Sequence, residues 1–228
     1  GLGDVYKRQV YDALSDPFYR IRLKALGSFG SATLDAPTIA RIEAIAKKDS
    51  SRITRAEAIA ELGKLKLSQY RSFFLSAVSD SSYSVSGEAL KALAGIDSAT
   101  ALKEAARLSG EKNKGKLLLA VTDVLVSYGG ESNFETVAEK FAAMPVGQEK
   151  FTFLMPFGEF VSKLTNPAQF RRGVDLIVAF RNAIPSQVRE RTDPYINGMI
   201  LGGILSKKEA AGAKEMADYI KSKTTSLK

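Results

Sequence analysis

The sequence contains no histidine and no cysteine among its 228 residues. The absence of histidine excludes zinc sites of the His-Glu-x-x-His type, Ser-His-Asp triads and histidine general bases within this chain. The absence of cysteine excludes disulfide bonds, thiolate metal sites and cysteine nucleophiles. A phosphate-binding Gly-x(4)-Gly-Lys-Ser/Thr loop is missing too, since residues 110–116 share only its glycine and lysine content. The sequence therefore predicts no catalytic, metal-binding or cofactor-binding residue in this chain.

Long apolar runs and basic clusters are also missing. The longest apolar run, residues 199–205, is much shorter than the roughly 20 residues of a membrane-spanning helix, so we expect no membrane span. The formal net charge is +8, but the basic residues are interspersed with acidic ones. This pattern favours a solvated surface over a phosphate-facing patch. The sequence therefore predicts no nucleic-acid partner.

Residues 1–9, GLGDVYKRQ, look foreign to a protein domain. We interpret them as translated sequencing adapter, because one reading frame of a common transposon-based adapter encodes this string. A disordered native tail is the alternative. On the adapter interpretation the native N-terminus lies further upstream, and with it any signal that would distinguish a cytoplasmic from an exported protein. The domain itself is then expected over residues 10–228.

Three segments of the chain align without gaps, namely residues 16–26, 49–59 and 80–90. Each begins with an aspartate, and these aspartates are 33 and 31 residues apart. Six positions later stand Arg22, Arg55 and Ser86, followed in each segment by alanine and then leucine or isoleucine. Self-similarity at this period is typical of helical repeats. It predicts an all-α fold, a HEAT-like or armadillo-type α-α superhelix of stacked antiparallel helix hairpins.

Each aligned segment is interpreted as the start of the second helix of a hairpin. The aspartate precedes proline or serine and can accept backbone N–H groups at a helix start. Gly30 and Gly63 are expected to cap the ends of these helices, since glycine adopts a left-handed conformation at little cost. Residues 37–46 and 67–78, which lie between the segments, have the apolar spacing of first helices.

The pattern Asp-x(5)-Arg-x-x-Ala-Leu/Ile resembles the HEAT repeat, in which the arginine and the preceding aspartate commonly brace neighbouring repeats. This resemblance implies a structural role between repeats for Asp16, Arg22, Asp49, Arg55 and Asp80. A row of ligand-binding arginines is the functional alternative.

After residue 97 the register loosens, but amphipathic or buried helices continue. The pattern predicts helices over residues 99–108, 114–128, 133–144, 149–164 and 167–184. The last stretch, residues 189–221, predicts two helices joined near Ser206. We therefore expect one HEAT-like domain over residues 10–228, with clear repeats in 10–97 and diverged helices in 98–228.

Two further groups of residues could carry function. The carboxylates Glu57, Glu61, Glu88 and Glu104 could pair for acid-base work, but their repeat-equivalent or outward positions favour a solvated face. Phe153, Phe157, Phe160 and Leu164 fall on one helical stripe beside Pro156. Core packing beneath a proline kink is the favoured interpretation, and a hydrophobic seat for another domain is the alternative.

Two sequence segments within the repeats resemble those of a particular helical domain. They are Asp-Pro-Phe-Tyr at residues 16–19 and Asp-Ser-Ser-Tyr-x-Val at residues 80–85. It is similar to the C-terminal domain of bacterial zinc metallopeptidases of the aminopeptidase N family, the gluzincins. The resemblance covers residues 10–228. It implies a parent enzyme whose zinc ligands and Gly-x-Met-Glu-Asn motif lie upstream, so zinc would be a cofactor of the parent and not of this chain.

In that family the helical domain closes over the catalytic domain and limits substrate access. The resemblance therefore implies an intramolecular catalytic domain as the partner, with Arg20, Arg22 and Lys24 as candidate contacts on the concave surface of the second helices. The alternative is a stand-alone HEAT-repeat scaffold that binds a protein partner. A start codon close upstream would favour the scaffold, whereas a His-Glu-x-x-His motif upstream would favour the peptidase.

Overall fold

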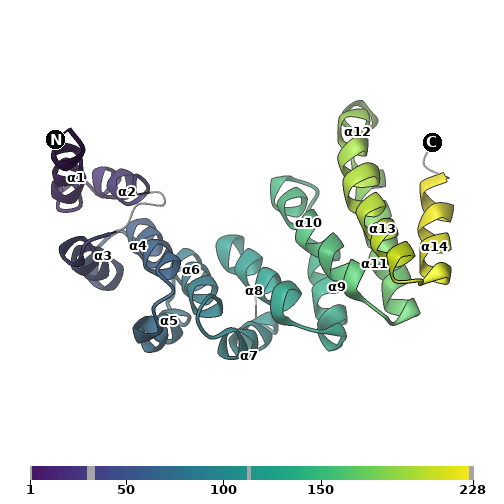
Figure 1. Cartoon of the computed structure of the whole chain (residues 1–228), viewed down its shortest axis with the longest axis horizontal. Coiled ribbons are helices and arrows are strands. Elements are labelled where there is room, and N and C mark those ends of the chain that lie inside the picture. Colours follow the sequence, from purple (N-terminus) through teal and green to yellow (C-terminus); the bar gives the residue numbers. More distant parts are fainter. Residues whose placement is uncertain (1, 30–33, 112–113, 226–228) are drawn as a thin grey trace. The chain divides into compact units, whose positions relative to one another are not determined.

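The computed structural model describes residues 2–29, 34–111 and 114–225. These residues form helices joined by short turns, without any strand among them. Within each of two compact parts of the chain, helices pack against their neighbours as in HEAT-like repeats, which confirms the predicted all-α fold class. The chain divides into two compact units, unit 1 over residues 1–124 and unit 2 over residues 125–228 (Figure 1).

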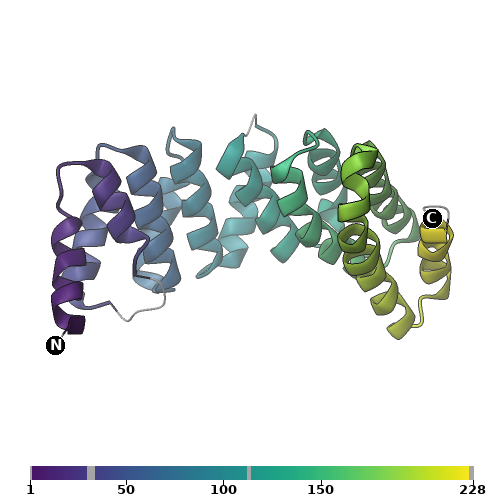
Figure 2. The same cartoon turned by 90° about the horizontal axis from the view of Figure 1, so that it is seen from above.

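Unit 1 consists of consecutive helix hairpins. Its helices are α1 (Leu2–Ala13), α2 (Tyr19–Leu26), α3 (Ala36–Lys48), α4 (Arg52–Lys64), η1 (Ser68–Tyr70), α5 (Arg71–Ala77), α6 (Tyr83–Ala94), α7 (Ser98–Ser109) and the first part of α8 (Gly115–Tyr128). The second helices α2, α4 and α6 lie side by side, with α4 also packed on α3 and α6 on α5 (Figure 2). The three predicted second helices and the first helices between them are thereby confirmed. Residues 2–9 are the first part of α1, and their origin as adapter stays a prediction.

The core of unit 1 lies between these second helices and their hairpin partners. Ala58, Ile59 and Leu62 of α4 have no exposed surface, and Ala89 and Leu90 of α6 have none either. These are the alanine and leucine or isoleucine positions of the repeat, spaced three or four apart on one helical face. Burial of this repeated face against the next hairpin is what drives the stacking.

The expected role of Gly63 as a helix cap is wrong. Gly63 lies inside α4, and the cap residue is Leu65. A Cβ added at Gly63 would be 2.8 Å from the Cβ of Ala92 on α6. Glycine is therefore needed there because two second helices approach closely, and not for a left-handed turn. Gly30, for which the same role was expected, lies outside the described residues.

Unit 2 begins within α8 and ends with α14. It contains η2 (Glu131–Asn133), α9 (Phe134–Ala143), α10 (Gln148–Lys163), α11 (Pro167–Ala183), α12 (Ser186–Asp193), the π-helical segment η3 (Pro194–Leu201), α13 (Gly202–Ala210) and α14 (Lys214–Thr225). The predicted break near Ser206 is wrong, because α12, η3 and α13 follow one another without interruption. The Ser206 hydroxyl donates to the Gly202 carbonyl inside the helix, at 3.0 Å. The chain turns instead at Gly212, whose φ is +69°.

The aromatic stripe of α10 forms the core of unit 2. Phe157 has no exposed surface, and Phe153, Phe160 and Leu164 are each at most 3% exposed. The ring of Phe157 stacks on that of Phe141 in α9, with 4.2 Å between centroids. The core-packing interpretation of this stripe is confirmed. Pro156 lies within α10, beside the exposed Met155.

Basic side chains cover the C-terminal ends of three helices in unit 2. The donated hydrogen bonds run from Lys150 to the carbonyls of Ala142 and Met144, from Lys208 to the carbonyl of Leu164, and from Arg189 to the carbonyls of Asn182 and Ile184. Cations at this end of a helix satisfy free carbonyls and the negative end of the dipole. Burial lowers the pKa of both lysines.

Candidate functional site

The repeat aspartates order the turn that enters each second helix. In Asp16, Asp49 and Asp80 the Oδ1 atom accepts the backbone N–H two residues later, at 2.8, 2.8 and 2.7 Å. The N-caps of the three second helices are Phe18, Ser51 and Ser82, and each helix begins at the residue after its N-cap. The aspartates therefore shape the turn before the helix and leave their second oxygen free for another contact.

Arg22 and Asp49 form the first contact of what we call the ladder, the arginine–aspartate pairs that join consecutive hairpins. Arg22 Nε and Nη2 donate to Asp49 Oδ2 and Oδ1 at 2.6 and 2.8 Å. Its Nη1 donates to the carbonyls of Asp16 and Pro17, in its own turn, at 2.7 and 2.9 Å. Burial alone would raise the pKa of Asp49, but hydrogen bonds from Arg22 and Ser51 and the nearby arginine charges lower it overall. Arg22 thus fixes its own turn to the next hairpin.

Arg55 and Asp80 form the second contact of the ladder, which is looser. Arg55 Nη1 donates to the carbonyl of Asp49 at 3.0 Å, but its Nη2 is 3.6 Å from Asp80 Oδ2. The two side chains are 23% and 26% exposed, against 12% and 4% for Arg22 and Asp49. The second contact therefore has the same residue types, but weaker pairing and more exposed side chains.

The ladder ends at the third repeat, where serine replaces arginine. The hydroxyl of Ser86 donates to the carbonyl of Val78, within its own hairpin, at 2.5 Å. The next carboxylate at the 31-residue spacing is Glu111, which pairs with Arg107 of its own hairpin at 2.9 Å. In the sequence, the alignment of Ser86 with Arg22 and Arg55 indicates where the ladder ends.

The repeat alignment gave no sign of a second set of contacts between hairpins. Arg71 Nε donates to Asp97 Oδ2 at 2.6 Å and Nη2 donates to Thr100 Oγ1 at 3.0 Å, which joins α5 to α7. The Tyr70 hydroxyl donates to Glu43 of α3 at 2.5 Å. These pairs link first helices, which the three aligned segments do not include. Only their distances of 26 to 29 residues, close to the repeat period, could have indicated them.

Asp97 makes the stability of unit 1 depend on pH. Its pKa is lowered to about 2, first by the Thr100 N–H and hydroxyl and then by Arg71. A pKa below that of the unfolded chain stabilises the fold above about pH 4, and this contribution is lost as pH falls toward 2.

Replacing Asp97 by asparagine keeps an acceptor for Thr100 but removes the charge. We expect Asp97→Asn to lower the melting temperature at pH 6, and the difference from the wild type to vanish near pH 2. A difference that persists unchanged at pH 2 would refute this origin.

The candidate contacts on the second helices differ in accessibility. Arg20 and Lys24 are exposed, and Arg20 Nε donates to the Tyr19 hydroxyl at 3.2 Å. Arg22 is engaged by Asp49 and the turn carbonyls, so its guanidinium belongs to the ladder. Of the three candidates, Arg20 and Lys24 are therefore positioned to meet a partner.

Large apolar side chains are exposed on the first turns of the same helices. Ile21 of α2 is 41% exposed, Ile53 of α4 50% and Tyr83 of α6 44%. They lie on three consecutive second helices that contact one another side by side. We call these three side chains, together with Arg20 and Lys24, the second-helix surface. The three apolar side chains stand five, four and three residues after their repeat aspartates, so they occupy different positions of the repeat.

The carboxylates do not form a paired acid-base site. Glu61 is only 3% exposed and bonds to Lys64 at 2.5 Å, so the solvated-face interpretation is wrong for this residue. Glu88 pairs with Lys116 at 3.0 Å and Glu104 with Arg107 at 2.8 Å. Over the described ranges, no three acidic, histidine or cysteine side chains gather in a way that could hold a metal ion. Nor does any helix there have the length and apolar content of a membrane span.

Comparison with known proteins supports the repeat architecture. A family model of HEAT repeats matches residues 39–125, which run from α3 into α8. No curated protein matches the chain. The matched stretch includes the second contact of the ladder, and Ile53 and Tyr83 of the second-helix surface. Together with the packing of the hairpins, it defines a HEAT-like helical domain.

Proposed function

We propose that this chain is a protein-binding helical scaffold and that its second-helix surface contacts the partner. The observation that carries this proposal is the exposure of Ile21, Ile53 and Tyr83 at equivalent ends of three consecutive helices. Ile53 and Tyr83 stand outside the buried positions of the repeat, whereas Ile21 aligns with the buried Thr54 and Val85. HEAT-like domains commonly bind other proteins along such a row of helices.

The charge of α2 favours an acidic partner surface. Its sequence, YRIRLKAL, contains three basic residues and no acidic one. Two of the basic side chains, Arg20 and Lys24, are exposed beside Ile21. A partner with carboxylates around an apolar patch would complement this end of the surface in both charge and hydrophobicity.

The more specific proposal is that the partner is the catalytic domain of an aminopeptidase N-like zinc metallopeptidase, in the same polypeptide and upstream of this chain. The resemblance at residues 16–19 and 80–85 supports it. Those segments include exposed aromatic side chains, Phe18 at 53% and Tyr83 at 44%, and not only core residues. In such a protein the zinc and the catalytic groups would belong to the upstream domain, and this chain would limit substrate access.

Extending the reading frame upstream of Val10 tests the peptidase proposal. A His-Glu-x-x-His motif a few hundred residues upstream is the expected result. A start codon directly before Val10 would contradict the peptidase parent and leave a stand-alone scaffold. An aminopeptidase assay on purified residues 10–228 should give no activity, and activity from this fragment would overturn the assignment of catalysis to another domain.

A further inference from the structure

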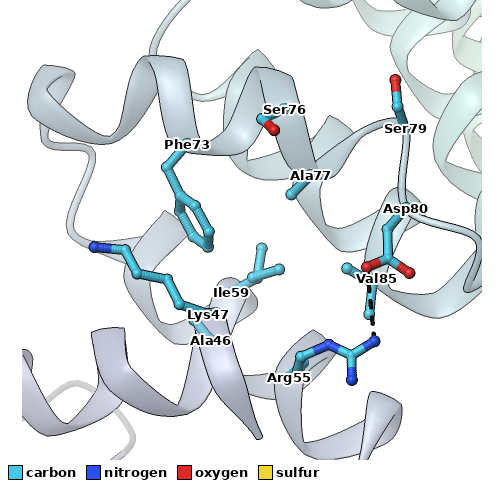
Figure 3. Close-up of a pocket in the computed structure, with 10 residues that line it drawn as sticks. All are labelled: Ala46, Lys47, Arg55, Ile59, Phe73, Ser76, Ala77, Ser79, Asp80 and Val85. Carbon is cyan, nitrogen blue, oxygen red and sulfur yellow. Dashed lines mark ion pairs between the residues drawn. The ribbon is translucent and has the colours of Figure 1, made fainter.

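A hollow in unit 1 and a hollow in unit 2 differ in what they offer a partner. The hollow in unit 1 lies beside the second contact of the ladder and has a volume of about 250 Å³. Figure 3 shows Lys47 and Arg55 at opposite ends of it, with Arg55 turned toward Asp80. Lys47 is 3.3 Å from Glu43 and Arg55 is 3.6 Å from Asp80. Each of the two cations is therefore engaged by its own carboxylate.

The hollow in unit 2 lies between α10 and the continuous helix formed by η3 and α13. Its volume is about 210 Å³. The residues that line it are Met155, Gly158, Glu159, Ser162, Met199, Ile200, Gly203, Ile204 and Lys207. All of them belong to unit 2, and none belongs to the second-helix surface. A contact at this hollow is therefore independent of the surface proposed above.

Two glycines and two isoleucines shape the floor of the hollow. Ile200 and Ile204 are at most 4% exposed. A Cβ added at Gly158 would be 2.7 Å from Ile200 Cγ2, so this glycine lets the two helices approach closely. A Cβ added at Gly203 would meet nothing within 4 Å. The absence of a side chain at Gly203 therefore leaves open space above an apolar floor.

α10 and the η3–α13 helix run in the same direction along the hollow. Gly158 of α10 lies against Ile200 of η3. Further on, the carbonyl of Leu164 accepts a hydrogen bond from Lys208 of α13 at 2.5 Å. Later residues of one helix thus meet later residues of the other. The hollow consequently has one end near the earlier residues of both helices and another near the later ones.

Two methionines stand exposed at the end near the earlier residues. Met155 of α10 is 46% exposed and Met199 of η3 is 57% exposed. Both border the same hollow. Methionine is unbranched and polarizable, so it adapts to a partner's shape, and it is enriched at protein interfaces. η3 is also π-helical, a geometry that is frequent at functional sites. This end therefore has the character of an apolar contact surface.

One carboxylate lies between two lysines at the other end of the hollow. Glu159 Oε2 accepts a hydrogen bond from Lys207, and its Oε1 lies 3.9 Å from Lys163 Nζ. The bond from Lys207 lowers the pKa of Glu159, so this carboxyl group is charged at neutral pH. Both lysine side chains are more than half exposed. The cluster therefore carries one excess positive charge, and its ammonium groups, with three N–H donors each, can accept a second carboxylate.

We propose that this hollow, which we call the methionine groove, docks an acidic segment of a partner protein. One apolar side chain of the segment would lie on Ile200 and Ile204 between the two methionines. A carboxylate further along the segment would reach Lys163 and Lys207. The volume suits a single side chain and not a whole small-molecule ligand, since pockets for such ligands start at about 300 Å³. Charge and shape thus select the same kind of partner.

Nuclear magnetic resonance of the full chain, labelled at the methyl groups of its four methionines, tests this proposal. The probe is the peptide acetyl-Glu-Glu-Leu-Glu-Glu-amide. We expect it to shift the methyl signals of Met155 and Met199 with a dissociation constant of about 1 mM. The signal of Met144, which is 4% exposed, should not move. No shift at 10 mM peptide, or equal shifts of Met144 and Met155, would contradict docking in the groove.

Two matched peptides separate the apolar side chain from the charge. Serine in place of leucine keeps the four carboxylates, and lysine in place of every glutamate keeps the leucine. Each is expected to bind at least tenfold more weakly at the Met155 and Met199 signals. Equal binding of the serine peptide would mean that only the net charge of the chain attracts the probe. Equal binding of the lysine peptide would mean that the partner is not acidic. Either result would overturn the proposal.

Two pairs of variants locate the site. Gly203→Leu fills the groove and should weaken the leucine peptide at least tenfold, whereas Gly198→Leu should leave binding unchanged. Neither glycine has an atom within 4 Å of an added Cβ, only Gly203 lines the groove, and leucine favours a helix more than glycine does. Circular dichroism checks that both variants fold.

The second pair of variants tests the charge. Lys207→Gln removes a cation from the groove and should weaken the peptide several-fold. Lys221→Gln removes a lysine of similar exposure that pairs with Glu209 outside the groove, and should have a smaller effect. Equal losses within either pair of variants would place the peptide elsewhere on the chain and refute the site.

Discussion

Replacing Phe157 by alanine is expected to lower the free energy of unfolding by about 3–5 kcal/mol. Phe157 has no exposed surface, and its ring stacks on Phe141 with 4.2 Å between centroids and 6° between planes. The substitution removes both the buried area and this stacking, and it leaves a cavity between α9 and α10 that rigid helices close only in part. Urea denaturation followed by circular dichroism measures the change.

Met155 provides the matched control for Phe157. It lies on the same helix but is 46% exposed. Met155→Ala should therefore cost less than about 1 kcal/mol, because surface substitutions rarely cost more. Similar losses for the two variants would mean that the aromatic stripe is not the core of unit 2.

Replacing Arg22 by alanine is expected to cost about 2–3 kcal/mol of unfolding free energy. The substitution removes two hydrogen bonds to Asp49 and two to the turn carbonyls of Asp16 and Pro17. It also leaves the carboxylate of Asp49, whose side chain is 4% exposed, without its cation. A buried charge that loses its partner costs more than the pair itself contributes.

A double-mutant cycle separates the energy of the Arg22–Asp49 pair from that of the hydrogen bonds between Arg22 and the turn carbonyls. Asp49→Ala alone should destabilise unit 1, and the combination with Arg22→Ala should cost clearly less than the two single changes together. The control is Arg107, which pairs with Glu104. The side chain of Arg107 is 48% exposed and that of Glu104 is 24% exposed. Arg107→Ala should cost about 0.5 kcal/mol or less. A cost as large as that of Arg22→Ala would contradict the ladder as a specific brace.

The repeat itself could be predicted from the sequence because the positions that recur in the sequence are also the ones that are buried or that form the turns. The alanine and leucine or isoleucine positions recur in register, and those positions are the buried ones, as in Ala58 and Ile59. The aspartates stand where the chain turns into each second helix. Periodicity reports these features directly, since the same local environment recurs in every hairpin.

Other features depend on the close approach of two segments and could not be predicted. Gly63 looked like a helix cap, but the nearby Ala92 of the next second helix explains the glycine. The contact of Arg71 with Asp97 joins two first helices. In each case the deciding partner is distant in sequence or depends on side-chain geometry.

The candidate site was predicted only in part. Its arginine and aspartate positions followed from the repeat, but the tight pairing at Arg22 and the loose one at Arg55 did not. The exposure of Ile53 and Tyr83 could not be inferred either, because apolar residues at helical spacing are usually buried.

The affinity of the proposed upstream catalytic segment for residues 10–228, each produced separately, tests the central claim most directly. Ile53→Asp places a charge in the second-helix surface and should weaken the complex at least tenfold in isothermal titration calorimetry. Leu67→Asp makes the same change at a residue 40% exposed outside that surface, and should leave the affinity unchanged. Equal effects of the two substitutions, or none from Ile53→Asp, would contradict the second-helix surface as the binding site.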